Sequence, residues 1–270
     1  MAVISSICQW RVSGLIDVSV DDDGDVGASG TTLRYCTVVG DEVATTWEQA
    51  RADLIIEGLP VRVPPTYRGQ RSYPGLFWAA TNDRTLVYES LLELDRLWLA
   101  DFDPGTVGIC TQPFQIAGRD STGLRAHVPD LLLVHSDHSA TVVDIKPAAF
   151  LEKPRVRAQF EWTRTLCHSK GWSYEVFTGG DPIVLRNLKL LAVGRRPDRL
   201  PNGDLVEARA RLGEEGITLG KVLARKPLTC GESAWRVAVF ALVWSGEVSL
   251  DLRRPLSSKT VLQATSEVKV

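Results

Sequence analysis

Two aspartates and a lysine, at the edges of two short apolar runs, are the residue types that metal-assisted phosphodiester chemistry needs. Asp130 stands at the head of one run, and Asp144 and Lys146 close the next. Because side chains alternate faces along a strand, Asp144 and Lys146 should share a face while Ile145 enters the core. If a hairpin brings Asp130 alongside, two carboxylates and an ammonium converge.

The chemistry of such a group is specific. Carboxylate oxygens are the ligands that Mg²⁺ prefers in proteins. A metal between Asp130 and Asp144 would activate water and neutralise charge on a scissile phosphate, with Lys146 placed on the nucleophile or on the phosphate. The pattern therefore predicts a nuclease with Mg²⁺ as its cofactor and Mn²⁺ as a substitute.

A helix predicted over residues 89–100 could supply a third carboxylate, from Glu93. However, Ser90-x-x-Glu93 before an apolar run is also typical of a capping box, in which the glutamate only returns a hydrogen bond to the helix start. Glu89, one turn earlier, is a second candidate. The sequence leaves these interpretations open.

The elements that must position these residues follow an α/β plan. After the helix at 89–100 come a strand-like stretch at 107–116, the two strands that carry the acids, a helix from 154 to 171 and a strand at 172–177. This order predicts a mixed sheet flanked by helices, with the acids at the centre of the sheet.

Composition divides the chain further. Residues 1–60 hold ten Asp and Glu against three Lys and Arg and predict an acidic N-terminal accessory segment, with a short helix at 46–58. Residues 195–216, rich in Arg, Pro, Gly and Asp, predict a linker between an endonuclease domain at 61–194 and a unit at 217–270. In that unit two predicted helices precede a basic-tipped hairpin. This order suggests a winged-helix-like domain that could contact DNA or a protein partner.

Basic residues follow the predicted site directly. Residues 145–211 hold thirteen Lys and Arg against seven Asp and Glu. Such a surface can hold DNA phosphates, although basic helices are often only solvated faces, and the charge pattern does not decide between the two. The arginines predicted to contact DNA are Arg68, Arg71, Arg155, Arg157 and Arg164.

The bulk composition excludes several other classes. With 44% hydrophobic and 24% charged residues, the chain has the composition of a soluble globular protein. It contains no apolar run long enough to span a bilayer, and its start lacks the basic region of a signal peptide, so a cytoplasmic protein without a membrane partner is expected. Five cysteines without a C-x-x-C pair argue against both a disulfide framework and a zinc cluster.

Taken together, these motifs resemble the TnsA-like endonuclease subunits of heteromeric transposases, within the PD-(D/E)XK nuclease superfamily. The resemblance covers about residues 61–191 well and the C-terminal unit loosely. It implies a restriction-endonuclease-like mixed sheet flanked by helices, with a small C-terminal winged-helix-like domain. The motifs that carry it are Tyr88-Glu-Ser-Leu-Leu-Glu93, Gln112-Pro-Phe114, Pro129-Asp130, Asp144-Ile-Lys-Pro-Ala-Ala149 and Gly171-Trp-Ser-Tyr-Glu-Val-Phe-Thr178.

The resemblance also implies roles for individual residues. Glu93, matched to the family's helix glutamate better than Glu89, would be catalytic and a metal ligand, as would Asp130 and Asp144. The carbonyl of Ile145 would add an oxygen ligand, and Lys146 would assist the attacking water. Some relatives carry glutamine at the position of Asp144.

The function implied by the resemblance is cleavage of the 5′ strand of double-stranded DNA at transposon ends. A DDE-type transposase would cut and join the other strand, and an AAA+ ATPase would act as regulator. The main rival is a stand-alone restriction or repair nuclease of the same fold. A non-catalytic DNA-binding subunit that keeps the fold without the reaction is the third interpretation.

Overall fold

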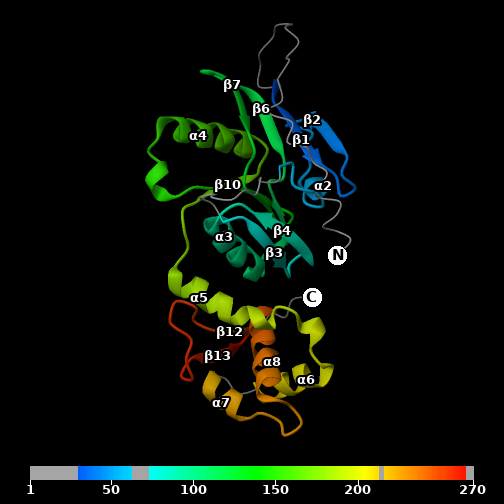
Figure 1. Ribbon diagram of the computed structural model, residues 1–270, viewed down its shortest axis with the longest axis vertical. Helices are drawn as coiled ribbons and strands as arrows, with labels where there is room; N and C mark the ends of the chain where they lie inside the picture. The colour runs from blue at the N-terminus through cyan, green and yellow to red at the C-terminus, as the bar shows by residue number, and fades with distance from the viewer. Residues whose placement is uncertain (1–29, 63–72, 213–215, 266–270) are drawn as a thin grey trace.

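The computed structural model describes residues 30–62, 73–212 and 216–265, and its architecture is mixed α/β, as predicted. Figure 1 shows an elongated molecule with an α/β unit toward one end and a mainly helical unit, formed by the C-terminal part of the chain, toward the other. Helix α5 (Pro182–Leu191) leads from the first unit to the second.

A four-stranded sheet in the order β10-β9-β8-β5 forms the centre of the α/β unit. Strands β8 and β9 form an antiparallel hairpin, and β10 runs parallel to β9. A parallel neighbour requires a crossover connection, and helix α4 (Pro154–Ser169) provides it. The strands are β5 (Thr106–Thr111), β8 (Leu131–His135), β9 (Ala140–Ile145) and β10 (Ser173–Phe177).

Alternate residues of β9 face different helices. Val143 packs in one core cluster with Leu97 of helix α3 (Leu91–Phe102), whereas Val142 packs in another with Cys167 of α4. All four side chains are fully buried. The sheet is therefore covered on both faces, which is why its central strands β8 and β9 carry nearly continuous apolar runs.

Two further sheets complete this unit: one of four strands in the order β2-β1-β6-β7, and the two-stranded sheet β3-β4. The short helix α2 (Ala52–Ile55) follows β2, and the 3-10 turn η2 (Ala148–Phe150) follows β9. The strands are β1 (Thr32–Cys36), β2 (Glu42–Thr46), β3 (Gly75–Ala79), β4 (Arg84–Tyr88), β6 (Gln115–Asp120) and β7 (Gly123–His127).

Residues 31–60 are built into this α/β unit. Strand β1 pairs with β6, and Trp47 is buried in the same core cluster as Phe114. The helix expected at 46–58 is correct only for α2, because Thr46 ends strand β2. Local helix preference is overridden here because burial of the indole stabilises an irregular segment after β2.

The C-terminal unit follows the order helix, strand, helix, helix, strand, strand, and its strands pair in the order β11-β13-β12. The linker expected at 195–216 is wrong in one respect, because α6 lies inside it and packs against α8, with Ala208 buried. The elements are the 3-10 turns η3 (Ala192–Gly194) and η4 (Pro197–Arg199), then α6 (Asn202–Arg211), β11 (Ile217–Thr218), α7 (Leu219–Ala224), α8 (Glu232–Trp244), β12 (Val248–Ser249) and β13 (Val261–Ala264).

Helix α8 is the centre of the C-terminal unit. Every residue from 238 to 244 is buried, because α8 packs against α5, α6, α7 and β12. Trp244 also joins the two units, since its ring centroid lies 6.4 Å from that of Trp98 and 5.2 Å from that of Phe102, both on α3. Residues 238–244 of α8 therefore belong to the core of this unit, whereas the first turn of the helix is exposed.

Two predictions about chemical class can be checked on the described residues. No helix among them has both the length and the apolar character needed to cross a membrane. The four cysteines in the described ranges are buried free thiols: Cys36, Cys110, Cys167 and Cys230.

Candidate active site

The start of β8 and the end of β9 place Asp130 and Asp144 on neighbouring strands. The backbone N–H of Asp130 donates to the carbonyl of Val143 at 3.1 Å, and the Asp130 Oδ2 accepts from the backbone N–H of Ile145 at 2.6 Å. Asp130 is thus attached, through both its backbone and its side chain, to the strand that carries Asp144 and leads to Lys146.

The charges of the other three residues predicted to be catalytic all influence the carboxyl of Asp130. Burial raises the pKa of its carboxyl to about 8, with the negative charges of Asp144 and Glu93 acting in the same direction. The hydrogen bond from Ile145 and the charge of Lys146 act in the opposite direction. A divalent cation bound to the Asp130 carboxylate would favour its ionised form over the protonated one.

Glu93 forms the capping box that its spacing predicts. Its backbone N–H donates to Ser90 Oγ at 3.2 Å, while its carboxylate accepts from Ser90 Oγ at 2.9 Å and from the backbone N–H of Glu89 at 2.8 Å. The side chain is buried, and this burial raises the pKa of its carboxyl. Glu89, the other candidate, instead forms an ion pair with Arg62 at 2.8 Å.

The substitution Glu93→Gln separates the capping role from a catalytic one, because glutamine keeps an acceptor for the cap but carries no charge. We expect it to be at least as stable as wild type, since burial disfavours the charged acid, and to slow cleavage by about tenfold or more. Ser90→Ala is the matched control: it should cost about 1 kcal/mol of stability and leave cleavage nearly unchanged. Urea unfolding and a nicking assay give the two quantities. If Glu93→Gln cleaves DNA as fast as wild type, Glu93 has only the capping role and no catalytic one.

Asp144 is held by two side chains to which the sequence assigns no role. His127 Nε2 lies 2.7 Å from Asp144 Oδ1 and 3.0 Å from Oδ2, and the Tyr174 hydroxyl donates to Oδ2 at 2.5 Å. Burial, followed by the charge of Asp144, raises the pKa of Tyr174 far above its ordinary value, so its hydroxyl stays protonated. His127 is the last residue of β7 and Tyr174 lies in β10, so only the strand arrangement brings them to Asp144.

The donor atoms of the site suit a hard divalent cation. Asp130 and Asp144 offer carboxylate oxygens, and Mg²⁺ is commonly bound by only one or two protein carboxylates, with water and substrate phosphate completing its ligands. Among the described residues, no group of three or more His, Cys, Asp and Glu side chains could hold a metal ion. Asp130 and Asp144 are thus the two carboxylates that would hold Mg²⁺, while the Glu93 carboxylate is engaged in its capping box.

Two neighbouring residues fix the edge of the site. Lys146 follows β9, and its backbone N–H donates to the carbonyl of Phe177 at 3.0 Å, so its side chain leaves from a fixed point on the sheet. Gln112 donates its backbone N–H to the carbonyl of Asp130 at 2.9 Å. Its φ of 41° is uncommon for a residue other than glycine, so strained backbone supports Asp130.

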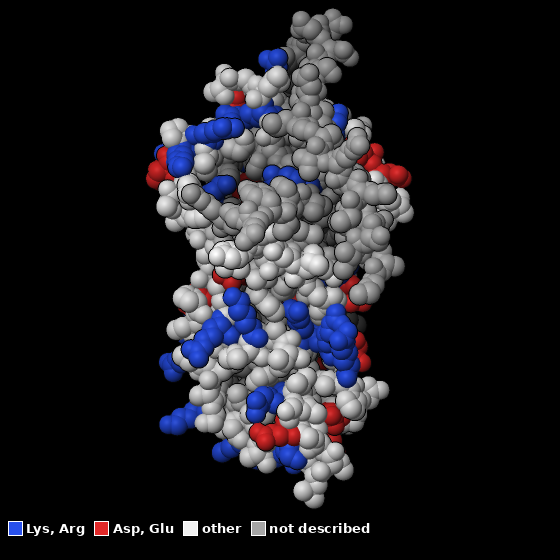
Figure 2. All heavy atoms as spheres, viewed as in Figure 1, with Lys and Arg blue, Asp and Glu red and all other residues white. Residues whose placement is uncertain are grey.

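The arginines predicted to contact DNA are not equally free to do so. Arg68 and Arg71 lie outside the described residues. Arg157 lies 3.6 Å from Glu152, whereas Arg155, exposed near the start of α4, has no ion-pair partner in the described part of the chain. Figure 2 shows Lys and Arg side chains over α4 and a second group over α5. These surfaces are suited to a phosphate backbone.

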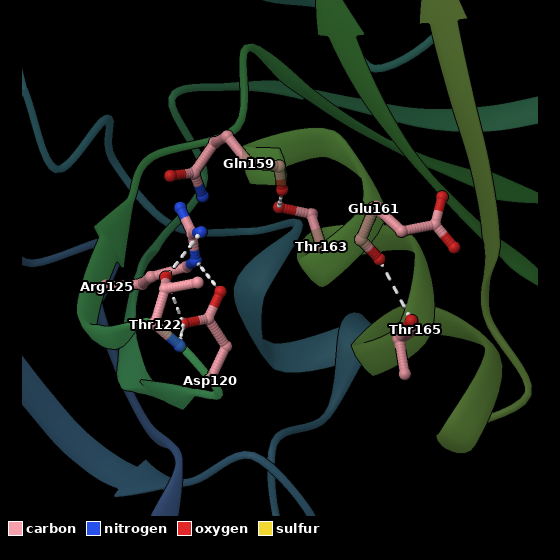
Figure 3. A network of polar contacts seen from close by, with 7 residues as sticks. All are labelled: Asp120, Thr122, Arg125, Gln159, Glu161, Thr163 and Thr165. Atoms are coloured by element: carbon pink, nitrogen blue, oxygen red, sulfur yellow. Dashed lines mark hydrogen bonds and ion pairs between the residues drawn. The ribbon is translucent and has the colours of Figure 1, made fainter. Parts of the chain in front are cut away.

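Other arginines near the site are held by acids. Arg164 lies 2.7 Å from Glu161, and its guanidinium lies 5.5 Å from the centroid of the Tyr174 ring. Figure 3 shows a comparable pair at the end of the β6–β7 hairpin, where Arg125 contacts Asp120. Replacing Arg164 would therefore disturb Tyr174, which bonds Asp144, as well as the surface charge.

Residues 103–179 match the family model described as TnsA-like endonuclease N terminal. The chain is similar to TnsA-like nucleases. The resemblance predicted for residues 61–191 is thus confirmed over a shorter segment. This segment contains every predicted catalytic residue except Glu93, which lies before it. The C-terminal unit lies outside it as well. No curated protein matches the chain.

Proposed function

We propose that this protein is an Mg²⁺-dependent DNA endonuclease and one subunit of a heteromeric transposase. The observation that supports this proposal best is the attachment of Asp130 to the strand that carries Asp144 and leads to Lys146, inside the segment similar to TnsA-like endonucleases. In this proposal the protein cleaves the 5′ strand at transposon ends, while a DDE-type transposase cuts and joins the other strand.

Each residue near the scissile phosphate has a task in this reaction. Asp130 and Asp144 hold the cation through carboxylate oxygens, and the carbonyl of Ile145 is a further oxygen donor. When bound, Mg²⁺ neutralises charge on the phosphate and lowers the pKa of the attacking water. The ammonium of Lys146 orients that water or balances negative charge in the transition state. Glu93 adds negative charge that favours cation binding.

The C-terminal unit serves partner contact in this proposal. The order of its helices and strands, with β13 between β11 and β12, is the order expected of a winged-helix-like domain. Because residues 238–244 of α8 serve the core of this unit, we assign the unit to contact with the transposase or with the AAA+ ATPase regulator. The DNA duplex then lies against the basic residues of α4.

A nicking assay tests the proposal. Wild-type protein is incubated with labelled transposon-end DNA and Mg²⁺, with and without the DDE transposase, and we expect cuts in the 5′ strand at the ends. Lys146→Ala should slow these cuts by about 10²-fold or more, because it removes the group that assists the attacking water. Lys221→Ala, which removes an exposed lysine of α7 in the other unit, is the matched control and should cut like wild type.

The same assay separates the rival functions. Efficient cleavage without any transposase would indicate a stand-alone restriction or repair nuclease. Binding of DNA by the wild type without cleavage under all of these conditions would indicate a non-catalytic DNA-binding subunit. Equal cutting by Lys146→Ala and wild type would exclude the lysine from the site.

A further inference from the structure

The carboxylate of Asp144 is enclosed by side chains from two other strands. His127 reaches both oxygens, at 2.7 and 3.0 Å, and the Tyr174 hydroxyl reaches Oδ2 at 2.5 Å. Asp144 itself is 1% exposed. We call His127 and Tyr174 the Asp144 clasp.

The clasp supplies hydrogen bonds to the Asp144 carboxylate in the ionised form that would bind a cation. An ionised carboxylate only accepts hydrogen bonds, so both clasp residues must donate, His127 through a protonated Nε2 and Tyr174 through its hydroxyl. Two donors from different strands also limit how the Asp144 carboxylate can rotate, which leaves its remaining lone pairs in fixed directions.

Asp130 is fixed by a separate contact, the hydrogen bond from the backbone N–H of Ile145 at 2.6 Å. The two carboxylates of the site are therefore oriented independently, one by the backbone and one by the clasp. Groups that orient a metal ligand without touching the metal typically contribute 10- to 100-fold to metal affinity or activity, roughly the range expected here.

We propose that His127 and Tyr174 are positioning residues that hold Asp144 as a ligand for the divalent cation. This inference rests on the proposed nuclease function. It assigns a part in cation binding to two residues outside the set of acids and lysine predicted from the sequence.

The test measures cation affinity without substrate as well as cleavage. Mn²⁺ binding to the full chain, followed by electron paramagnetic resonance, should weaken by about 10- to 100-fold in Tyr174→Phe and in His127→Leu. In His127→Gln the side-chain amide can still donate to Asp144, so this variant should recover a large part of the affinity. Raising the Mg²⁺ concentration should restore part of the lost cleavage, because the loss lies in cation binding.

His135→Leu is the matched control for loss of a partly buried histidine. His135 Nε2 lies 2.9 Å from Thr141 Oγ1 at the other end of the β8–β9 hairpin, so the variant loses a comparable ring and a comparable hydrogen bond. Its Mn²⁺ affinity should equal that of wild type. A similar loss of affinity in His135→Leu and His127→Leu would indicate general destabilisation of the hairpin and overturn the inference.

The outcomes separate this inference from the proposed function. If wild type binds Mn²⁺ and cuts DNA but Tyr174→Phe and His127→Leu bind as tightly as wild type, the positioning role is wrong and the nuclease stands. Tighter binding in these variants would mean that the clasp competes with the cation, which also overturns the inference. If wild type neither binds Mn²⁺ nor cuts, the proposed function fails.

Discussion

Asp130→Asn is expected to abolish strand cleavage and, at the same time, to make the protein harder to unfold at neutral and alkaline pH. Cleavage should fall by about 10³-fold or more, because one of the two carboxylates proposed to hold the cation is lost. Stability should rise because burial and the charges of Asp144 and Glu93 disfavour the ionised form of Asp130. Asparagine keeps the oxygen that accepts from the Ile145 N–H but carries no charge.

The pH dependence of this gain follows from the direction of the shift. The pKa of Asp130 is raised from 3.8 to about 8 on folding, so between these values the folded protein keeps a proton that the unfolded chain releases. The stability that this proton contributes is complete below about pH 4 and is lost as the pH rises through about 8. The advantage of Asp130→Asn in free energy of unfolding should grow over this range to at least about 2 kcal/mol.

Urea unfolding at a series of pH values, together with nicking assays, measures both effects. Asp137→Asn is the control, because Asp137 is an exposed residue in the turn of the same hairpin and hydrogen bonds from Ser139 lower the pKa of its carboxyl. It should cut like wild type and gain no stability as the pH rises. A stability difference between Asp130→Asn and wild type that stays constant with pH would contradict the electrostatic account of the site.

The central strands and the helix before them are predictable from the sequence because their signals are local. Alternation of faces along one strand places Asp144 on the opposite side from Ile145, which is buried in the core cluster on the α3 side. The spacing of Ser90 and Glu93 marks the start of α3, because a capping box involves only residues within one turn. These signals require no knowledge of how the elements pack.

The rest of the site depends on contacts between segments that are distant in the chain. The partners of Asp144 stand 17 and 30 residues away, so neither has a local signal of its role. The same reason explains why the sequence does not predict α6. The polar composition of residues 195–216 predicts a linker, although Ala208 of α6 is fully buried against the C-terminal core. Burial of a small residue in a charged segment can be predicted only when the helix against which it packs is known.

Trp47 makes it possible to measure how much a contact between distant segments contributes to stability. Its ring is 2% exposed, its centroid lies 6.0 Å from that of Phe114 and 5.3 Å from that of Trp172, and its Nε1–H donates to the carbonyl of Leu166 at 3.0 Å. Trp47→Ala removes this packing and leaves the Leu166 carbonyl without its indole donor. We expect a loss of about 3 to 5 kcal/mol in the free energy of unfolding, measured by the shift of the urea midpoint.

The result measures how strongly residues 31–60 stabilise the α/β unit. Leu54→Ala is the control from the same segment: Leu54 is 51% exposed in α2, and its loss should change stability by no more than about 0.5 kcal/mol. Removing residues 1–60 should then leave no stable nuclease unit, because strand β1 leaves its pairing with β6 as Trp47 leaves the core. If Trp47→Ala unfolds at the wild-type urea concentration, the segment contributes little to the fold. A large loss of stability would instead show that burial of the Trp47 indole holds this acidic segment in the α/β unit.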